Sequence, residues 1–333
     1  METFTFAQNF ALIALNAQDS LHMPTVKKIA VRCMAAAAIL ECYMDHGFVM
    51  QGEQLTFDRT HLNRSGLPQH QRAVLECILG KKASVQNTLP HFLEQVAHFS
   101  SRKLKTIERS FTDYLKAHDV LEEIPNLLGC DMNYVTAEVS MREYRSDESL
   151  YARLTEGLRA EILEDGAVTD EMLLMLWLLR ESSCLFDLFS EEEVHQVASR
   201  MNEIYYENPL AKQLFVVEIH NSWEFFAKNF LKAKKQTFTT PVGIGVNFSF
   251  PFLERSQSIF IDVEAWFEGK ENRLHDVTAR LEKYGHHYTI LREGTVPLIK
   301  IDNILYEAVP TIFQSKVPVQ GMRLRRYPQA ILK

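Results

Sequence analysis

Three basic side chains share one face of a predicted helix that begins near residue 101. Arg102, Lys105 and Arg109 recur at i, i+3 and i+7, and this spacing places them on one side of a helix. A serine, Ser100 or Ser101, is the predicted N-cap, so free backbone N–H groups and the positive end of the helix dipole lie beside them. Phosphate groups bind where positive side chains and backbone donors combine. The pattern therefore predicts an anion-binding site at this helix start.

The other residues that could do chemistry are arranged less favourably. His286 and His287 are adjacent at the start of a predicted strand, so their side chains point to opposite faces and do not form a metal-ligand pair. Asp262 and Glu264 fall on one face of another predicted strand and could act together in acid–base catalysis. Such a pair is more often the solvated face of an edge strand. We predict no catalytic residue, no metal site and no cofactor.

The composition is typical of a globular protein without a strong attraction to nucleic acid. The chain has 333 residues, of which 46% are hydrophobic and 24% charged, and its net charge is -7. The longest apolar run, residues 30–44, contains Arg32 and Glu41 and is too short to span a bilayer. Five cysteines are scattered without a paired spacing, and the N-terminus lacks a basic signal-peptide region. These features predict a reduced, cytoplasmic protein that binds no nucleic acid.

Hydrophobic periodicity predicts a mainly α fold with two domains. Residues 1–235 are expected to form an all-helical domain, centred on a helix over 169–189 that is apolar on nearly every face. Residues 119–132 interrupt the helices as a protruding β-hairpin that turns at Ile124-Pro125-Asn126. Residues 236–333 are expected to form a small α+β domain. The other predicted helices span about residues 24–47, 66–80, 84–99, 101–118, 147–164, 190–206, 211–235 and 272–284, and the predicted strands span 243–250, 258–267, 288–291, 298–301 and 304–308.

Four stretches carry a family resemblance. They are FALIALNAQDS, the alanine-rich helix AVRCMAAAAILECYMDHGF, the hairpin VLEEIPNLLGCDM, and the helix pair YRSDESLYARLTEGLRAEILEDGAVTDEMLLMLWLLRESSCLFDLF. In this order they resemble the Golgi phosphoprotein 3 family of phosphoinositide-binding adaptors, which has bacterial members. The likeness covers about residues 4–235, and residues 236–333 have no counterpart in it. It implies an all-helical domain with a β-hairpin used in self-association. Eukaryotic members bind phosphatidylinositol 4-phosphate and help to retain glycosyltransferases.

The family's head-group pocket gives a residue-by-residue expectation. It uses a tryptophan before the alanine-rich helix, an arginine inside that helix, and two arginines three residues apart before the hairpin. The corresponding positions here are residues 24–26, Ala35 or Ala36, Lys105 and Glu108. Lys105 alone keeps a positive charge, and the carboxylate of Glu108 is expected to weaken the basic cluster.

We therefore expect a non-enzymatic peripheral membrane adaptor that binds anionic phospholipid head groups of the phosphatidylinositol 4-phosphate type. The expected head-group ligands are Lys105, Arg109, Arg102 and Arg32. An exposed apolar hairpin tip is expected to add membrane or oligomer contacts through Ile124, Leu127 and Leu128. The C-terminal domain is expected to bind a protein partner, and the protein to form a homo-oligomer in the cytoplasm, in part on the inner membrane surface.

Two alternatives stay open. The first is a soluble protein-interaction scaffold that oligomerises through its hairpin and does not bind lipid. The second is an enzyme whose site lies in the C-terminal domain around Asp262, Glu264 and His287.

Overall fold

The computed structural model describes residues 4–52, 54–80, 88–164, 166, 168–219, 234–238, 248–252, 258–263, 269–314 and 317–327. The protein is mainly α-helical with a β-sheet in its C-terminal part, as predicted. Its contacts divide the chain into two units, and each unit is assembled from three separate stretches. The first unit contains residues 1–15, 23–121 and 153–253, and the second contains residues 16–22, 122–152 and 254–333. This division by contacts differs from the predicted single boundary at residue 235.

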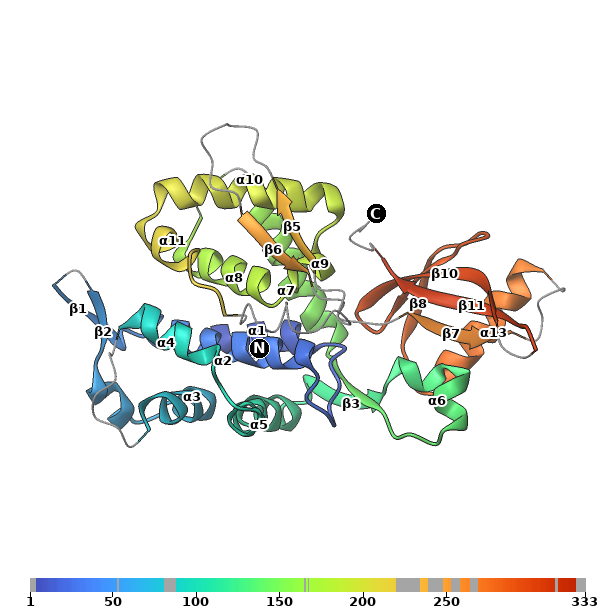
Figure 1. Ribbon diagram of the computed structural model, residues 1–333, viewed down its shortest axis with the longest axis horizontal. Helices are drawn as coiled ribbons and strands as arrows, with labels where there is room; N and C mark the ends of the chain where they lie inside the picture. The colour runs from blue at the N-terminus through green and yellow to red at the C-terminus, as the bar shows by residue number, and fades with distance from the viewer. Residues whose placement is uncertain are drawn as a thin grey trace. The chain divides into compact units, whose positions relative to one another are not determined.

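The first unit is built around α2 (Thr25–Met44), which lies among the other helices of this unit (Figure 1). Four consecutive alanines, Ala35–Ala38, have no exposed surface, and their small side chains let neighbouring helices approach closely. The helix follows Pro24, which favours a helix start because its φ is already helical. The helices in contact with α2 are α1 (Phe6–Leu15), α3 (Gln69–Leu79), α4 (Leu89–Val96), α5 (Ser101–Ala117) and α8 (Asp170–Glu181).

The predicted central helix is confirmed as α8, although it is shorter than expected. Its apolar run is buried on all sides, and the indole N–H of Trp177 donates to the backbone oxygen of Val217 at 3.2 Å. The helix ends at Glu181, and Ser183 then takes a φ of 62° before the short helix α9 (Leu185–Leu188). The predicted helix over 169–189 is therefore two helices.

The remaining elements complete the first unit and agree with the predictions only in part. A two-stranded hairpin follows α2 and consists of β1 (Phe48–Gln51) and β2 (Gln54–Phe57). The helix predicted over 211–235 ends early, and its residues 220–233 lie outside the described part of the chain. The elements not yet given are η1 (Arg59–Asn63), α7 (Glu148–Leu163), α10 (Glu191–Glu207), α11 (Pro209–Leu214), β5 (Lys234–Phe238) and β6 (Phe248–Phe252).

A buried carboxylate, Glu41, ties three elements of the first unit together. Its oxygens accept hydrogen bonds from the Ala7 backbone N–H at 2.7 Å, the Gln71 amide at 2.6 Å and His70 Nε2 at 2.9 Å. The His70 ring also stacks on Phe111, with ring centres 4.6 Å apart. Burial on its own raises the pKa of Glu41, but the hydrogen bond and charge of His70, together with the hydrogen bonds of Thr5 and Ala7, outweigh it, so the pKa is lowered overall.

We expect the first unit to lose stability in acid because of Glu41. The carboxylate has a lower pKa when folded than its ordinary value of 4.5, so its contribution is present above this pH and is lost as the pH falls below it. Glu41→Gln should flatten the fall in unfolding free energy between about pH 5 and about pH 3, measured by urea unfolding with circular dichroism. Glu94→Gln, at an exposed glutamate of α4, should leave the wild-type slope unchanged. Equal slopes in all three proteins contradict the assignment.

The second unit contains an antiparallel five-stranded sheet in the order β7-β11-β10-β9-β8. The helix α13 (Lys270–Lys283) contacts β11 and buries Val277 and Leu281. The turn Asp302-Asn303 joins β9 to β10, two strands that the sequence predicts. The edge strand β7 is shorter than expected, and β11 was not predicted. The strands are β7 (Ile259–Asp262), β8 (Tyr288–Arg292), β9 (Leu298–Ile301), β10 (Ile304–Phe313) and β11 (Val319–Arg326).

The predicted hairpin has a different second strand. Its first strand is β3 (Leu121–Pro125), which pairs with β4 (Arg142–Ser146) rather than with residues immediately after the turn. The connection between the strands contains η2 (Leu127–Cys130) and α6 (Met132–Thr136), so this is a long excursion rather than a tight hairpin. The capping oxygens of Asn126 and Asp131 start these two short helices and break the strand.

The expected exposed apolar tip is wrong for this segment. Ile124 and Leu127 are only 5% and 3% exposed. Leu127 and Cys130 belong to the same hydrophobic cluster as the inward face of the five-stranded sheet, and Leu128 packs against it. The apolar side chains that suggested an exposed membrane or oligomer contact therefore complete the core of the second unit.

Candidate functional site

The three basic residues predicted on α5 lie together on its exposed face. Arg102, Lys105 and Arg109 are exposed, and the opposite face of the helix is buried. Ser100, rather than its neighbour, is the N-cap: its hydroxyl accepts from the Lys103 backbone N–H at 3.4 Å. The first turn contains no acidic residue. We call Arg102, Lys105 and Arg109 the basic face.

The neighbouring lysine is held differently. The Lys103 ammonium donates to the backbone oxygen of Cys77 at 2.7 Å and lies 5.0 Å from the centre of the Phe99 ring. The positive charge of Lys103 therefore interacts with groups of the first unit itself. By contrast, the side chains of the basic face form no ion pair with any residue that the structure describes, which leaves their charges directed to solvent.

Glu108 does not weaken the basic face in the expected way. Its carboxylate meets the Lys27 ammonium at 2.6 Å, and the two side chains are only 9% and 1% exposed. The pair lies on the buried side of α5, so the negative charge is neutralised there. The exposed side of the helix keeps a net positive charge.

Two positions expected in a head-group pocket are not at the surface. Arg32 lies on α2 and is buried, so it does not join the basic face. Ala35 and Ala36, which correspond to the family's in-helix arginine, have no exposed surface. The described residues therefore bring together three of the four predicted head-group ligands and separate the fourth.

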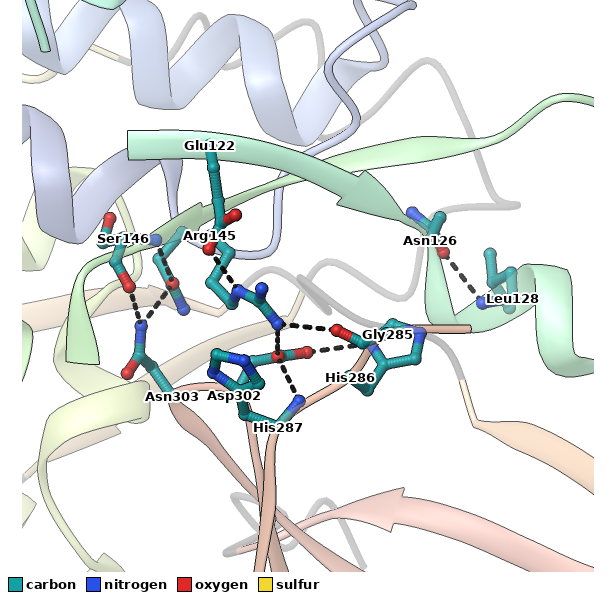
Figure 2. A network of polar contacts seen from close by, with 11 residues as sticks. Glu122, Asn126, Leu128, Arg145, Ser146, Gly285, His286, His287, Asp302 and Asn303 are labelled. Carbon is teal, nitrogen blue, oxygen red and sulfur yellow. Dashed lines mark hydrogen bonds and ion pairs between the residues drawn. The ribbon is translucent and has the colours of Figure 1, made fainter. Parts of the chain in front are cut away.

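A second group of polar side chains lies inside the second unit (Figure 2). The Asp302 carboxylate accepts from Arg145 Nη1 at 2.7 Å and from the His287 backbone N–H at 3.1 Å. Its other oxygen lies 2.9 Å from Nδ1 of His286. Arg145 also donates to Glu122 at 2.7 Å. We call this network, together with Glu143, the Asp302 cluster.

The turn that carries Asp302 is anchored by its neighbour. Asp302 has a φ of 52°, a left-handed conformation that Asp tolerates better than most residues. The Asn303 amide donates to the backbone oxygen of Ser146 at 2.8 Å and to the side chain of Asn16 at 2.9 Å. The segment 16–22 in turn bonds to β4, with the Ala17 N–H donating to the Tyr144 oxygen at 2.8 Å. The cluster therefore joins all three stretches of the second unit.

The two buried carboxyl groups of the cluster, Glu143 and Asp302, have opposite electrostatic environments. Burial, followed by the negative charge of Asp302, raises the pKa of Glu143 to about 8. Burial also acts to raise the pKa of Asp302, but the hydrogen bonds and charges of His286 and Arg145 outweigh it and the pKa is lowered. Asp302 is therefore the charged member of the pair at neutral pH.

The residues considered for an enzyme site are not brought together in the described part of the chain. His286 is buried and His287 is exposed, so the two rings lie on opposite faces as predicted. Asp262 forms an ion pair with Arg280 at 2.8 Å. Glu264 lies outside the described residues.

Sequence reasoning missed the Asp302 cluster for a definable reason. The sequence prediction for His286 considers only its neighbour His287. Its actual partner, Asp302, lies across the β8–β9 pair, in which Tyr288 is opposite Ile301. Pairing those two predicted strands is the signal that could have placed His286 beside Asp302. Glu143 and Arg145 come from a distant strand, and nothing in the sequence marks that contact.

No helix among the described residues is both long and apolar enough to cross a membrane. A scan against models of protein families finds no match, and a search of the curated proteins finds no significant match either.

Proposed function

We propose that the protein is a non-enzymatic adaptor that docks reversibly on anionic phospholipid surfaces through the basic face of α5. The observation that supports this proposal is the arrangement of Arg102, Lys105 and Arg109. All three side chains are exposed on the first half of one helix, while the only nearby carboxylate predicted to oppose them, Glu108, is buried and paired. The resemblance to phosphoinositide-binding adaptors points to the same helix.

The expected affinity is modest. Each Lys or Arg near an anionic bilayer contributes about 1 kcal/mol, so three residues supply about 3 kcal/mol. The net charge of -7 opposes the approach of the protein at low salt. The buried residues Ile124 and Leu127 do not add the apolar contact that was expected from them. Tyr114 is an exposed aromatic residue on the same helix, and an amphipathic ring suits the interfacial region.

We expect the full chain to co-sediment with phosphatidylserine vesicles at low salt and to be released at high salt. Lys105→Glu with Arg109→Glu should remove about 2 kcal/mol and weaken binding at least about 30-fold, because both attractive charges are reversed. Vesicles that also carry phosphatidylinositol 4-phosphate distinguish a specific head-group site from general charge attraction. Vesicles of phosphatidylcholine alone should bind no protein.

The matched control changes the net charge by the same amount elsewhere. Lys212→Glu with Lys270→Glu reverses two exposed lysines, on α11 and α13. This variant should keep most of the binding. Failure of the wild-type chain to bind anionic vesicles at low salt rejects the proposal. Equal losses in the two double variants reject the assignment to α5.

A scaffold that does not bind lipid is the second candidate function. The observation that favours it is the β1–β2 hairpin, where Val49 and Met50 are exposed apolar residues. This hairpin, rather than the β3–β4 pair, presents apolar side chains for self-association. Vesicle binding that is absent while the chain still forms oligomers in solution favours the scaffold.

A further inference from the structure

Three side chains of the Asp302 cluster are arranged as the ligands of a single ion. One oxygen of Glu143, one of Asp302 and a ring nitrogen of His286 all lie within 4.8 Å of one another. A Zn²⁺ ion bonded to nitrogen and oxygen ligands at about 2.0–2.2 Å holds them about 3.3 Å apart when tetrahedral. His286 Nδ1 and Asp302 Oδ2 already lie 2.9 Å apart, so this pair needs only a small adjustment.

The charges of the cluster leave a place for a divalent cation. Glu143 and Asp302 are two buried carboxyl groups in one site, and the Glu122 carboxylate also pairs with Arg145. With an ion bound, all three carboxyl groups would be ionised, and Arg145 balances only one of these charges. A buried carboxylate without a compensating cation carries a high desolvation cost. A divalent ion next to a neutral imidazole brings the sum to zero.

His286 is the nitrogen ligand of the site. Its side chain is 0% exposed, and its Nε2 atom has no hydrogen-bond partner among the described residues. The nitrogen beside Asp302 is Nδ1, so an ion bound in the site would replace the hydrogen bond between Nδ1 and Asp302, and Nε2 lies on the other side of the ring. A small cavity of about 10 Å³ adjoins the site and is lined by both Glu143 and Asp302. That volume suits an ion or one water molecule and excludes an organic ligand.

The geometry points to a divalent transition-metal site formed by Glu143, His286 and Asp302. One nitrogen and two carboxylate oxygens suit Zn²⁺ among the common ions, with water in the fourth position. The ligands come from β4, from the residue pair before β8 and from the β9–β10 turn. The ion would therefore clamp the middle stretch of the chain onto the C-terminal sheet. This site is independent of the basic face on α5.

The test uses the full chain after treatment with EDTA and removal of the chelator. Calorimetric titration with ZnCl₂ should give one site per chain, and Co²⁺ should give the visible absorption of a low-symmetry nitrogen–oxygen site. Glu143→Gln and His286→Gln should each weaken zinc binding at least about tenfold, because each removes one of three protein ligands. His287→Gln is the matched control, since it makes the same change at the adjacent exposed position. It should bind zinc like the wild type.

Hydrogen exchange in the wild-type chain gives a reading that does not depend on how the variants fold. Zinc should slow exchange in peptides that cover β4, the residues before β8 and the β9–β10 turn. Three results overturn the site. The first is no zinc binding at about 100 μM, which would mean that the cluster holds only water. The others are equal zinc affinity in the wild type and His286→Gln, and zinc-induced protection confined to other parts of the chain.

Discussion

Asp302→Ala is expected to lower the free energy of unfolding of the second unit by about 3–5 kcal/mol. The substitution removes the buried one of two carboxylates that Arg145 meets at 2.7 Å, and it leaves this arginine, only 9% exposed, with the exposed Glu122 alone. It also removes the acceptor for His286 Nδ1 and for the His287 N–H. Breaking a buried ion pair from one side is costly because the remaining charge stays buried and loses its buried partner.

Hydrogen exchange across β9 and β10 measures this loss for the second unit alone. Alanine also strains the left-handed turn at residue 302, whereas asparagine tolerates that conformation. Asp302→Asn should therefore show a smaller loss that reflects the charge. The control is Asp262→Ala, which removes a half-exposed partner of Arg280 and should cost about 0–1 kcal/mol. An Asp302→Ala protein no less stable than this control contradicts the prediction.

Lys27→Met should destabilise the first unit by about 3–5 kcal/mol, and adding Glu108→Leu should recover most of that loss. The single change leaves the Glu108 carboxylate buried without the ammonium that now lies 2.6 Å away. The double change replaces both charges with apolar groups of similar size, so no charge remains to be desolvated. Urea unfolding followed by helical circular dichroism measures both, because this unit is mainly helical.

The double variant distinguishes charge from packing. If the loss of unfolding free energy in the double variant equals the sum of the losses in the two single variants, then shape, not charge pairing, governs this site. Glu108→Leu alone should lower the unfolding free energy nearly as much as Lys27→Met, because it leaves the Lys27 ammonium buried without this carboxylate. Vesicle binding by the recovered double variant should match the wild type, since the basic face is untouched.

Local patterns predicted the helices of the first unit well. The start of α10 was readable because Ser190 and Glu193 form a capping box. The central position of α8 was predictable because its apolar residues cover all sides of the helix, so other helices must pack around it. Both signals act within a few residues, so one sequence contains all the information they need.

Long-range packing was the part that the sequence did not reveal. The composition change near residue 235 suggested a boundary, but Leu127 and Cys130 bury themselves against strands more than a hundred residues later. The basic face was predictable because it lies on one helix. Whether Glu108 opposed it depended on Lys27, about eighty residues earlier and on another helix. The Asp302 cluster needed a contact between β4 and a distant turn, which no local pattern encodes.

The interleaved second unit imposes an order on synthesis. Ile124 and Leu127 leave the ribosome long before the strands that cover them, the last of which ends at Arg326. At about 5–20 residues per second, this segment waits on the order of ten seconds or more for its partners. During that interval its apolar side chains are available to chaperones or to other nascent chains. Slowing translation after residue 152 should therefore raise aggregation of the nascent protein more than slowing it after residue 326.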